Sequence, residues 1–358
     1  MHQTSLPWEQ SVSNPTKEKT CGGRMEVVVD FDLVKKVDLA TQIVAYTINP
    51  IGMLLNGVLI YVIVRGTPQE FKSYSILLFN FAVCDFCSCF SALLAIQKTV
   101  FSGFSLTYVF HGTCGRVSPF FCYFLHTFVC HCFAHSQWIL MVSFIYRYCL
   151  LIKIVPKSTH VSLICFGFYL LTVAIMGPYL LVAGDSRVLR AEMTKAHPEY
   201  RFDDVKIWPD LVVSGNESIL SPLTAVAIAY MCLSCVPVYT TVIIFRYKTL
   251  ALLESNVLSM SEATKRIHRQ LIKALTLQAS IPCFWVAAAS LYLLCLFGVI
   301  RGSVWIDNVI FRIMECMPTI SPLISLYFIT PYRRRVRSWI KRDKKTNPSS
   351  AARSYTAM

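Results

Sequence analysis

The chain has 358 residues, of which 55% are hydrophobic and 15% are charged, and its mean hydropathy is +0.52. A soluble globular domain carries roughly 25% charged residues, so the composition excludes a water-soluble enzyme and a disordered protein. Taken alone, the formal net charge of +14 suits a basic nucleic-acid-binding patch. In a chain this apolar, the Lys and Arg excess of cytoplasmic membrane-protein loops explains it better, and we expect no nucleic-acid partner.

Seven apolar stretches are long enough to cross a bilayer. A transmembrane helix needs about 20 residues to span the roughly 30 Å hydrocarbon core. The sequence therefore predicts an all-α membrane protein, with a seven-transmembrane helix bundle over residues 41–330. The predicted spans are residues 41–64, 73–97, 117–147, 159–184, 218–245, 272–300 and 305–330. The last span is the weakest, because Asp307, Arg312 and Glu315 lie near its start.

Charge in the connecting segments predicts the orientation. The first, third and fifth connections and the tail, with the bases that flank the spans, carry 20 Lys and Arg against 4 Asp and Glu; the other side carries 14 against 15. The positive-inside rule therefore places the basic tail, residues 331–358, in the cytoplasm. It places the N-terminal segment 1–40 and the long loop 185–217 outside. The tail suits the anionic lipids of the inner leaflet.

Two features of the extracellular parts follow from this orientation. The first 38 residues contain no apolar stretch that could be a signal-peptide core, so we expect the first span to act as its own signal anchor. The sequon Asn216-Glu217-Ser218 lies in the loop predicted to be outside, whereas Asn14 and Asn347 both precede proline. The sequence therefore predicts a glycan on Asn216.

Two charged residues mark candidate functional positions within the spans. Asp85 is the only ionisable residue at the centre of a span, where an Asp costs about 2.5 to 3.5 kcal/mol, so we expect it to face the bundle interior. It is either part of a switch or a structural hydrogen-bonding group between helices. Arg147 ends the third span, where its guanidinium either ties two spans together in one state or anchors the helix at the membrane surface.

Polar residues nearer the outside suggest a ligand cavity. Arg312 and Glu315 are three residues apart and can pair on one helix face. We predict that they line an outward-facing cavity with His126; alternatively, the membrane begins later than the predicted span. His131 and His135 share a helix face, a spacing that can bind metal, but buried histidines that bond between helices explain the pair better. We expect no metal and no cofactor.

A basic stripe precedes the sixth span. Lys265, Arg269 and Lys273 recur every four residues and therefore lie on one face of a helix that projects into the cytoplasm. This stripe either docks an acidic partner or is a solvated face that follows the positive-inside rule. The sequence leaves both interpretations open.

Several motifs resemble those of G-protein-coupled receptors. "NFAVCD" is similar to the Asn-Leu-Ala-x-x-Asp element and places Asp85 at that superfamily's sodium-site aspartate. "LLNG" places Asn56 at its first-span asparagine. "YRY" resembles the Asp/Glu-Arg-Tyr element, with Tyr146 in place of the acid, Arg147 at the conserved basic position of the superfamily and Tyr148 after it. The resemblance implies that these five residues form the signalling switch.

The motifs also depart from the superfamily pattern. The sixth span reads "IPCFW" and the seventh reads "SPLISLYF", in place of Cys-Trp-x-Pro and Asn-Pro-x-x-Tyr. Cys122 lies 25 residues before Arg147, as the superfamily's disulfide cysteine does, but the loop 185–217 has no Cys to pair with it. A disulfide, if one forms, is expected to join Cys21 and Cys114.

With these departures, the sequence resembles a nematode chemoreceptor family more closely. The segments "NPIGMLLN", "YSILLFNFAVCDF", "HSQWILMVSFIYRY" and "SPLISLYFITPYR" are similar to the serpentine receptor class delta family, over about Ala40 to Arg337. The resemblance implies a receptor for a small-molecule cue in the plasma membrane, in the sensory cilia of chemosensory neurons. It also implies signalling through a heterotrimeric G protein, with the stripe of Lys265, Arg269 and Lys273 at the contact.

The favoured interpretation is therefore a chemosensory receptor and not an enzyme. A ligand-gated channel or transporter is the main alternative, because charged residues lie within the membrane. A membrane metalloenzyme that uses His131 and His135 is a further alternative.

Overall fold

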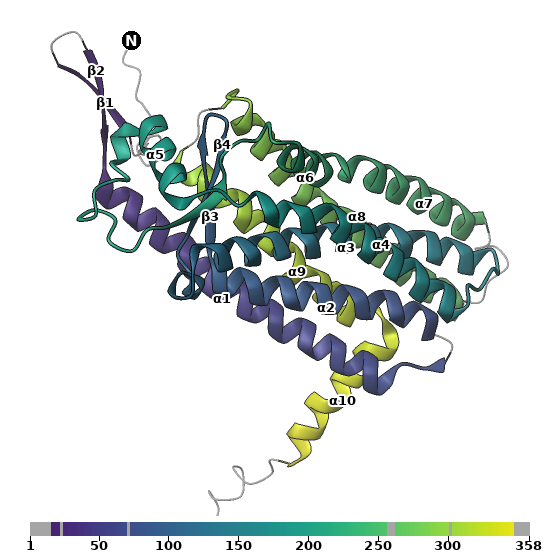
Figure 1. Ribbon diagram of the computed structural model, residues 1–358. Coiled ribbons are helices and arrows are strands. Elements are labelled where there is room, and N and C mark those ends of the chain that lie inside the picture. Colours follow the sequence, from purple (N-terminus) through teal and green to yellow (C-terminus); the bar gives the residue numbers. More distant parts are fainter. Residues whose placement is uncertain (1–15, 22–23, 70–71, 256–261, 301–302, 347–358) are drawn as a thin grey trace, which may run out of the picture.

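Seven helical spans form the bundle in the computed structural model, which describes residues 16–21, 24–69, 72–255, 262–300 and 303–346. All backbone hydrogen bonds of a helix are internal, which is why apolar stretches of this length cross a bilayer as helices. The helices are α1 (Phe31–Gly66), α2 (Lys72–Ala95), α3 (Pro119–Leu151), α4 (Ser158–Tyr179), α6 (Pro222–Leu233) with α7 (Cys235–Ser255), α8 (Glu262–Leu296) and α9 (Val304–Phe328) (Figure 1). The prediction of a seven-helix membrane bundle is confirmed.

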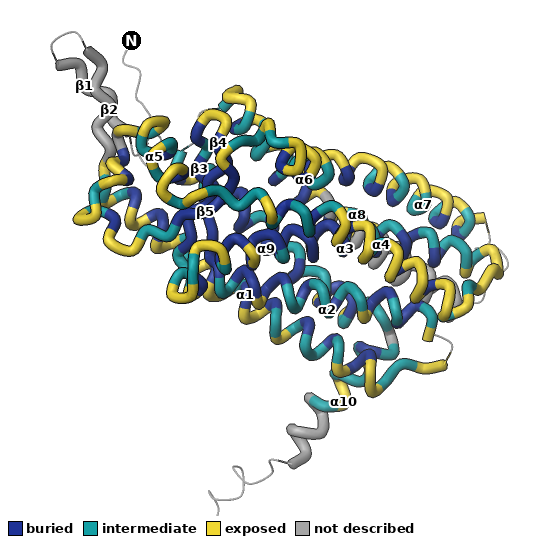
Figure 2. The backbone as a smooth tube through the Cα atoms, in the orientation of Figure 1, coloured by how far each residue is buried: buried dark blue, intermediate teal, exposed yellow. Residues whose placement is uncertain are grey.

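Helix α3 lies at the centre of the bundle. It has the most buried span, and it packs against α2, α4 and α7. Figure 2 shows the buried backbone of α3 and α9 surrounded by exposed outer helix faces. The outer faces of α4 and α6 carry exposed apolar side chains such as Leu163, Phe166, Val226 and Leu233. This pattern is the one expected of a bundle surrounded by lipid, because lipid tails are as apolar as the side chains that face them.

Local capping sets where several helices begin. Asp30 accepts a hydrogen bond from the Leu33 amide at the start of α1. Ser118 accepts one from the Phe121 amide at the start of α3, where Pro119 occupies the first helical position. Such caps satisfy amides that have no partner inside the helix. Helix α1 therefore begins ten residues before the predicted span, and its first three turns extend beyond the apolar stretch.

Strands at one end of the bundle were not predicted, so the structure is not purely helical. Strands β3 (Gln97–Ser102), β4 (Ser105–Phe110) and β5 (Val212–Asn216) form an antiparallel sheet in the order β3-β4-β5. Strands β1 (Thr16–Cys21) and β2 (Arg24–Val29) form a separate antiparallel hairpin. We call the end of the bundle that carries β3, β4 and β5 the sheet end, and the other end, where α10 (Thr330–Thr346) follows α9, the tail end.

The loop 185–217 is an ordered lid rather than an open connection. Helix α5 (Ser186–Ala196) packs on β3, β4 and β5, and the chain then returns to form β5. The lid has its own apolar core, in which Leu189, Met193 and Trp208 pack against α1 and the sheet. Close backbone contact explains Gly215 in β5: its φ is +154°, and an added Cβ would overlap the Leu106 carbonyl oxygen.

Candidate functional site

A cavity of about 80 Å³ lies between the sheet and the centre of the bundle. Strand β4 and helices α3, α4, α6, α8 and α9 form its wall. Ala, Cys, Ile and Met side chains form most of the wall, and its rings are those of Tyr108, His126, Tyr179, Trp285, Tyr292 and Phe311. No Asp, Glu, Lys or Arg is found among the described residues that line the cavity, so its chemistry suits an uncharged and largely apolar molecule.

His126 is the most polar group of the wall. Its Nδ1 is 2.9 Å from Gln97 Oε1, and because a carbonyl oxygen only accepts, Nδ1 carries the proton. The ring stacks on Tyr108 at a centroid distance of 3.9 Å and is only 2% exposed. Its Nε2 is therefore an acceptor, 3.8 Å from the Sγ of Cys130, which also lines the cavity. His126 therefore lines a cavity, and its predicted contact with a ligand stays a prediction.

Arg312 and Glu315 do not line the cavity, which corrects the sequence prediction. Arg312 Nη1 and Glu315 Oε2 are 2.7 Å apart, and both residues are buried on the face of α9 that turns towards α1 and β3. Glu315 accepts a hydrogen bond from Asn49 of α1, and Arg312 donates to the Gln97 carbonyl. The neighbouring Phe311 and Met314 form the cavity wall instead, because they point to the opposite side of the helix.

Gln97 connects this ion pair to the cavity. Its backbone carbonyl accepts from Arg312, while its side-chain Oε1 accepts from His126. Gln97 is the first residue of β3 and is buried, so it holds both contacts at the junction of α9, α3 and the sheet. The ion pair therefore lies behind the cavity wall, and Gln97 connects it to His126 in that wall.

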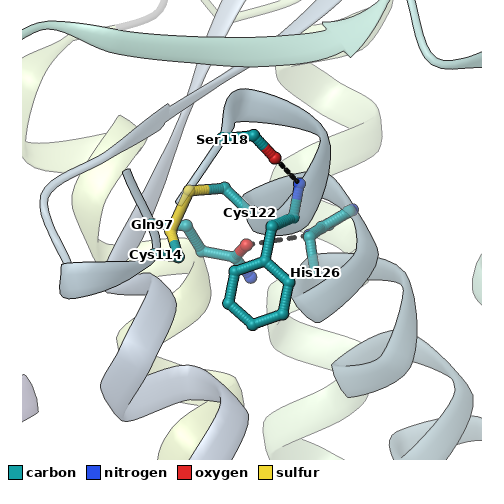
Figure 3. The surroundings of a disulfide bond; sticks show 6 residues. Gln97, Cys114, Ser118, Cys122 and His126 are labelled. Carbon is teal, nitrogen blue, oxygen red and sulfur yellow. Dashed lines mark hydrogen bonds between the residues drawn. A yellow bond between two sulfur atoms is a disulfide. The ribbon is translucent and has the colours of Figure 1, made fainter. Parts of the chain in front are cut away.

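The disulfide prediction is wrong. Cys114 pairs with Cys122, at a Cα–Cα distance of 5.2 Å, and not with Cys21 (Figure 3). The bond closes a loop of eight residues and fixes the start of α3 to the 3-10 turn Thr113–Arg116. A cysteine pair only eight residues apart was overlooked because the superfamily pattern points to a partner in the loop 185–217. The side chain of Cys21 is not among those that the structure describes.

The buried position of Asn216 contradicts the predicted glycan. Asn216 is 1% exposed, and its Nδ2 donates to the hydroxyl of Tyr123 and to the Val182 carbonyl. Its Oδ1 accepts from Tyr179 at 2.6 Å. A glycan is attached through Nδ2 and needs solvent around it, so the folded protein has no room for one at this position. Asn216 instead joins β5 to α3 and α4 above the cavity.

Asp85 lines a second, smaller cavity of about 40 Å³ on the tail-end side of the first. It is buried, and its Oδ1 accepts a hydrogen bond from Ser136 of α3 at 3.3 Å. Ser321 of α9 and Phe133 of α3 line the same cavity. The structure thus places Asp85 in the bundle interior, where the sequence predicted it.

Asn56 lies on the α9-facing side of α1. Its Nδ2 donates to the carbonyls of Gly52 and Pro318, at 2.9 and 2.8 Å. The Pro318 carbonyl is available because Pro322, four residues later, has no amide to donate to it. Asn56 therefore stabilises α1 against the proline-bent part of α9 and does not contact Asp85 directly.

Arg147 is buried near the tail end and contacts α2. Its guanidinium donates to the Tyr74 hydroxyl and lies 5.1 Å from the centre of the Tyr74 ring. Tyr146, at the place where the superfamily has an acid, stacks on the same ring at 5.8 Å. Tyr74 therefore contacts Arg147 through both its hydroxyl and its ring face. The sequence prediction missed Tyr74, which no motif marks.

The remaining predicted contact residues lie at the tail end. Tyr148 packs edge-on against Phe245 of α7 at 5.4 Å. Lys265, Arg269 and Lys273 belong to the first part of α8. Lys273 is exposed, and the side chains of Lys265 and Arg269 lie outside the described ones.

The histidine pair on α3 has no metal-binding partner. His131 and His135 are stacked at 6.3 Å, and Tyr169 of α4 packs edge-on against both rings. Among the residues that the structure describes, no three His, Cys, Asp or Glu side chains are placed to hold a metal ion. The pair forms part of the α3–α4 contact.

A buried ion pair ties the sheet to the bundle and was not predicted. Lys98 Nζ of β3 and Asp38 Oδ2 of α1 are 2.5 Å apart, and Asn308 of α9 donates to the other oxygen of Asp38. His111 Nε2 is 3.9 Å from Asp38 Oδ2. Burial, together with the Lys98 ammonium, lowers the pKa of His111 to about 4, so the ring is neutral at pH 7.

Comparison with known proteins identifies the family. The profile described as "Serpentine type 7TM GPCR chemoreceptor Srd" matches residues 41–338. The chain is similar to three receptors of Caenorhabditis elegans. It is 48% identical to serpentine receptor class delta-3 over 90% of this chain and 94% of the relative. It is 49% identical to class delta-1 over 79% and 76% of the two chains, and 41% identical to class delta-2 over 85% and 84%.

These matches cover the whole bundle, including the cavity, Asp85, Arg147 and the lid. The family is one of multi-pass membrane receptors and not of enzymes. The seven helices and the matched profile lead to one conclusion: the chain belongs to the Srd family of serpentine seven-transmembrane chemoreceptors.

Proposed function

We propose that this chemoreceptor binds a small uncharged molecule in the cavity beneath the sheet and signals through a heterotrimeric G protein at the tail end. The charge asymmetry supports this orientation, since the side with 20 Lys and Arg against 4 acids contains α10. In this proposal the sheet end and lid face the outside. The receptor lies in the plasma membrane of a chemosensory neuron, in its sensory cilium.

The cavity wall restricts the chemistry of the ligand. A charged ligand would lose its hydration without gaining a counter-ion, because none of the described side chains that line the wall is charged. The Nε2 of His126 offers one acceptor, which suits a ligand hydroxyl. The proposed ligand is therefore a small, uncharged and mostly apolar molecule.

A contiguous series of contacts leads from the cavity to Arg147, and this observation carries the proposal. Trp285 of α8 lines the ligand cavity and packs edge-on against Phe133 of α3 at 5.8 Å. Phe133 lines the second cavity together with Asp85 and Tyr74. Tyr74 holds Arg147. A shift of Trp285 on ligand binding would therefore repack the cavity that includes Tyr74, which contacts Arg147.

The proposed active state has α3 and α8 separated at the tail end. Ligand binding favours this state by its higher affinity for it. Arg147 then leaves Tyr74 and, with Tyr148, becomes available to the G protein. Lys265, Arg269 and Lys273 lie on the adjacent part of α8 and suit an acidic partner surface.

Signalling in cells that express the chain tests the proposal. Pooled volatile and water-soluble cues are applied while a second messenger and the membrane current are recorded together. We expect a messenger response that disappears in Arg147→Ala and after G proteins are disabled, with surface expression unchanged. Arg147→Lys is the matched variant: it keeps the charge but loses the planar guanidinium, so we expect a weakened response.

Two results would contradict the proposal. A current that survives both Arg147→Ala and the loss of G proteins would indicate a ligand-gated channel. An evoked messenger response that is equal in wild type and Arg147→Ala would remove Arg147 from the switch.

A further inference from the structure

The residues that line the cavity differ in exposure, and the partly exposed ones lie on one side of it. The wall residues from β4, α3, α4 and α9 are all buried. The four partly exposed ones are Ile228 and Met231 on α6, and Ala289 and Tyr292 on α8. The cavity therefore comes closest to the exterior between α6 and α8.

In the part of the chain that the structure describes, the sheet end has no comparable opening. β5 pairs with β4, and the Gly184 amide donates to the Gly215 carbonyl at 2.8 Å. Beyond β5, the Ile219 amide donates to the Phe104 carbonyl in the turn between β3 and β4, also at 2.8 Å. Helix α5 covers the outer side of this sheet, so a molecule arriving from water meets two layers of structure.

The gap between α6 and α8 faces the hydrocarbon region. Neither α6 nor the part of α8 from Ala274 to Leu296 contains a charged residue. Val226 and Leu233 of α6 and Val286 of α8 are exposed beside it. The Trp285 indole donates to the Met231 carbonyl at 3.1 Å, which closes the gap on its tail-end side.

We propose that ligands enter the cavity from the bilayer, through a portal formed by Ile228, Met231, Ala289 and Tyr292. The portal selects for apolar molecules that partition into the membrane before they bind. The proposal rests on the cavity being the ligand site, as proposed above, but it makes no assumption about the G protein.

Carbene labelling of the purified receptor in lipid nanodiscs tests the portal. The probe is trifluoromethyl phenyldiazirine, which dissolves in the bilayer, and its benzoate analogue, which stays in water, is the comparison. After photolysis, peptide mass spectrometry measures labelling of Phe311 and Met176, which lie on buried parts of the wall. We expect the apolar probe to label both residues and the benzoate to label neither.

Two matched variants place the entry route. Ala289→Phe fills the portal, and we expect labelling of Phe311 to fall on the order of tenfold, because the packed gap has no room for both ring and probe. Ala287→Phe makes the same change two residues away on the exposed lipid face of α8, and we expect unchanged labelling. Labelling of exposed Val226 checks that the probe concentration in the bilayer is equal, and thermal melting checks that both variants fold.

Three outcomes would overturn the portal. These are labelling of Phe311 by the benzoate as strongly as by the apolar probe, unchanged labelling in Ala289→Phe, and no labelling of the wall by either probe. Because no G protein is present, failure of the signalling proposal leaves this test intact. Conversely, a messenger response together with benzoate labelling would keep the receptor proposal and remove the portal.

Discussion

Single residues at the tail end show which groups contact Arg147, whose neighbour Tyr146 stands in the position of an acid. Tyr146 stands where the superfamily has an acid, and the structure gives Arg147 the Tyr74 hydroxyl and ring face as partners. A hydrogen bond to a charged group contributes about 1.5–3 kcal/mol, which is enough for the Tyr74 hydroxyl to hold Arg147 in the inactive state that we propose.

The first prediction concerns this hydroxyl. Tyr74→Phe removes the hydrogen bond to Arg147 but keeps the ring that stacks on Tyr146. We expect basal G-protein signalling to rise roughly tenfold, because about 1.4 kcal/mol corresponds to one factor of ten in an equilibrium. Messenger level per receptor at the cell surface measures this, with Tyr46→Phe on the exposed face of α1 as the matched control. Equal basal levels in the two variants would show that Tyr74 does not hold the switch.

The second prediction concerns Asn216. Because its side chain joins Tyr123, Tyr179 and Val182, Asn216→Ala leaves buried polar groups without partners and should lower stability by about 3 kcal/mol. We also expect treatment of the wild-type protein with a glycosidase to leave its mass at this peptide unchanged. Thermal melting and peptide mass spectrometry check the two parts. A glycan on Asn216 would show that the lid does not adopt this structure.

At the scale of elements, the sheet depends on a close approach of two strands. Strands β4 and β5 pair from Leu106↔Asn216 to Phe110↔Val212, and Gly215 lies opposite Thr107. Its backbone conformation is one that residues with a Cβ rarely adopt. The element that carries Asn216 into the bundle therefore requires glycine immediately before it.

The third prediction follows from this approach. Gly215→Ala places a Cβ against the Leu106 carbonyl, and we expect loss of β5 pairing, a lower melting temperature and reduced surface expression. Gly167→Ala in α4 is the matched control: nothing lies within 4 Å of its added Cβ, and alanine favours a helix by about 1 kcal/mol over glycine. Equal melting temperatures for the two variants would contradict the close approach.

At the scale of the whole molecule, the receptor consists of a helical bundle closed at one end by a lid. The ion pair of Lys98 and Asp38, with Asn308, joins β3, α1 and α9 where the sheet meets the bundle. Neutral His111 lies beside it, and Arg312 is a further positive charge that disfavours the protonated ring. Adding a proton to His111 therefore destabilises the junction between the sheet and the bundle.

The fourth prediction gives the pH range over which protonation of His111 lowers the stability of the protein. His111 has a folded pKa of about 4 against an ordinary value of 6.5, so the unfolded chain binds more protons between these values. The stability contribution is fully present above pH 6.5 and falls as the pH drops towards 4, by about 3 kcal/mol in total. The melting temperature of the wild type should decrease over this range more than that of His111→Gln. Parallel curves for the two proteins would show that His111 does not titrate in this way.

The sequence determined the bundle because its main signal is local. Apolar stretches of about 20 residues have one stable form in a bilayer, so seven spans, the buried place of Asp85 and the tail-end place of Arg147 followed from residue types and spacing. The family motifs are short and contiguous, and they were readable for the same reason. His126 lies on the buried face of α3, and its predicted contact with a ligand stays a prediction.

Only the tertiary structure decided the contacts between distant segments. The sheet needs residues 97–110 to meet residues 212–216, and no local pattern encodes that pairing. For the same reason the sequence assigned Asn216 to the surface, Cys21 to Cys114, and Arg312 and Glu315 to the cavity wall. The contact of Tyr74 with Arg147 and that of Trp285 with Phe133 also join residues that are far apart in the sequence. The burial, partners and direction of a side chain depend on neighbours far along the chain, which is why the site required the folded structure.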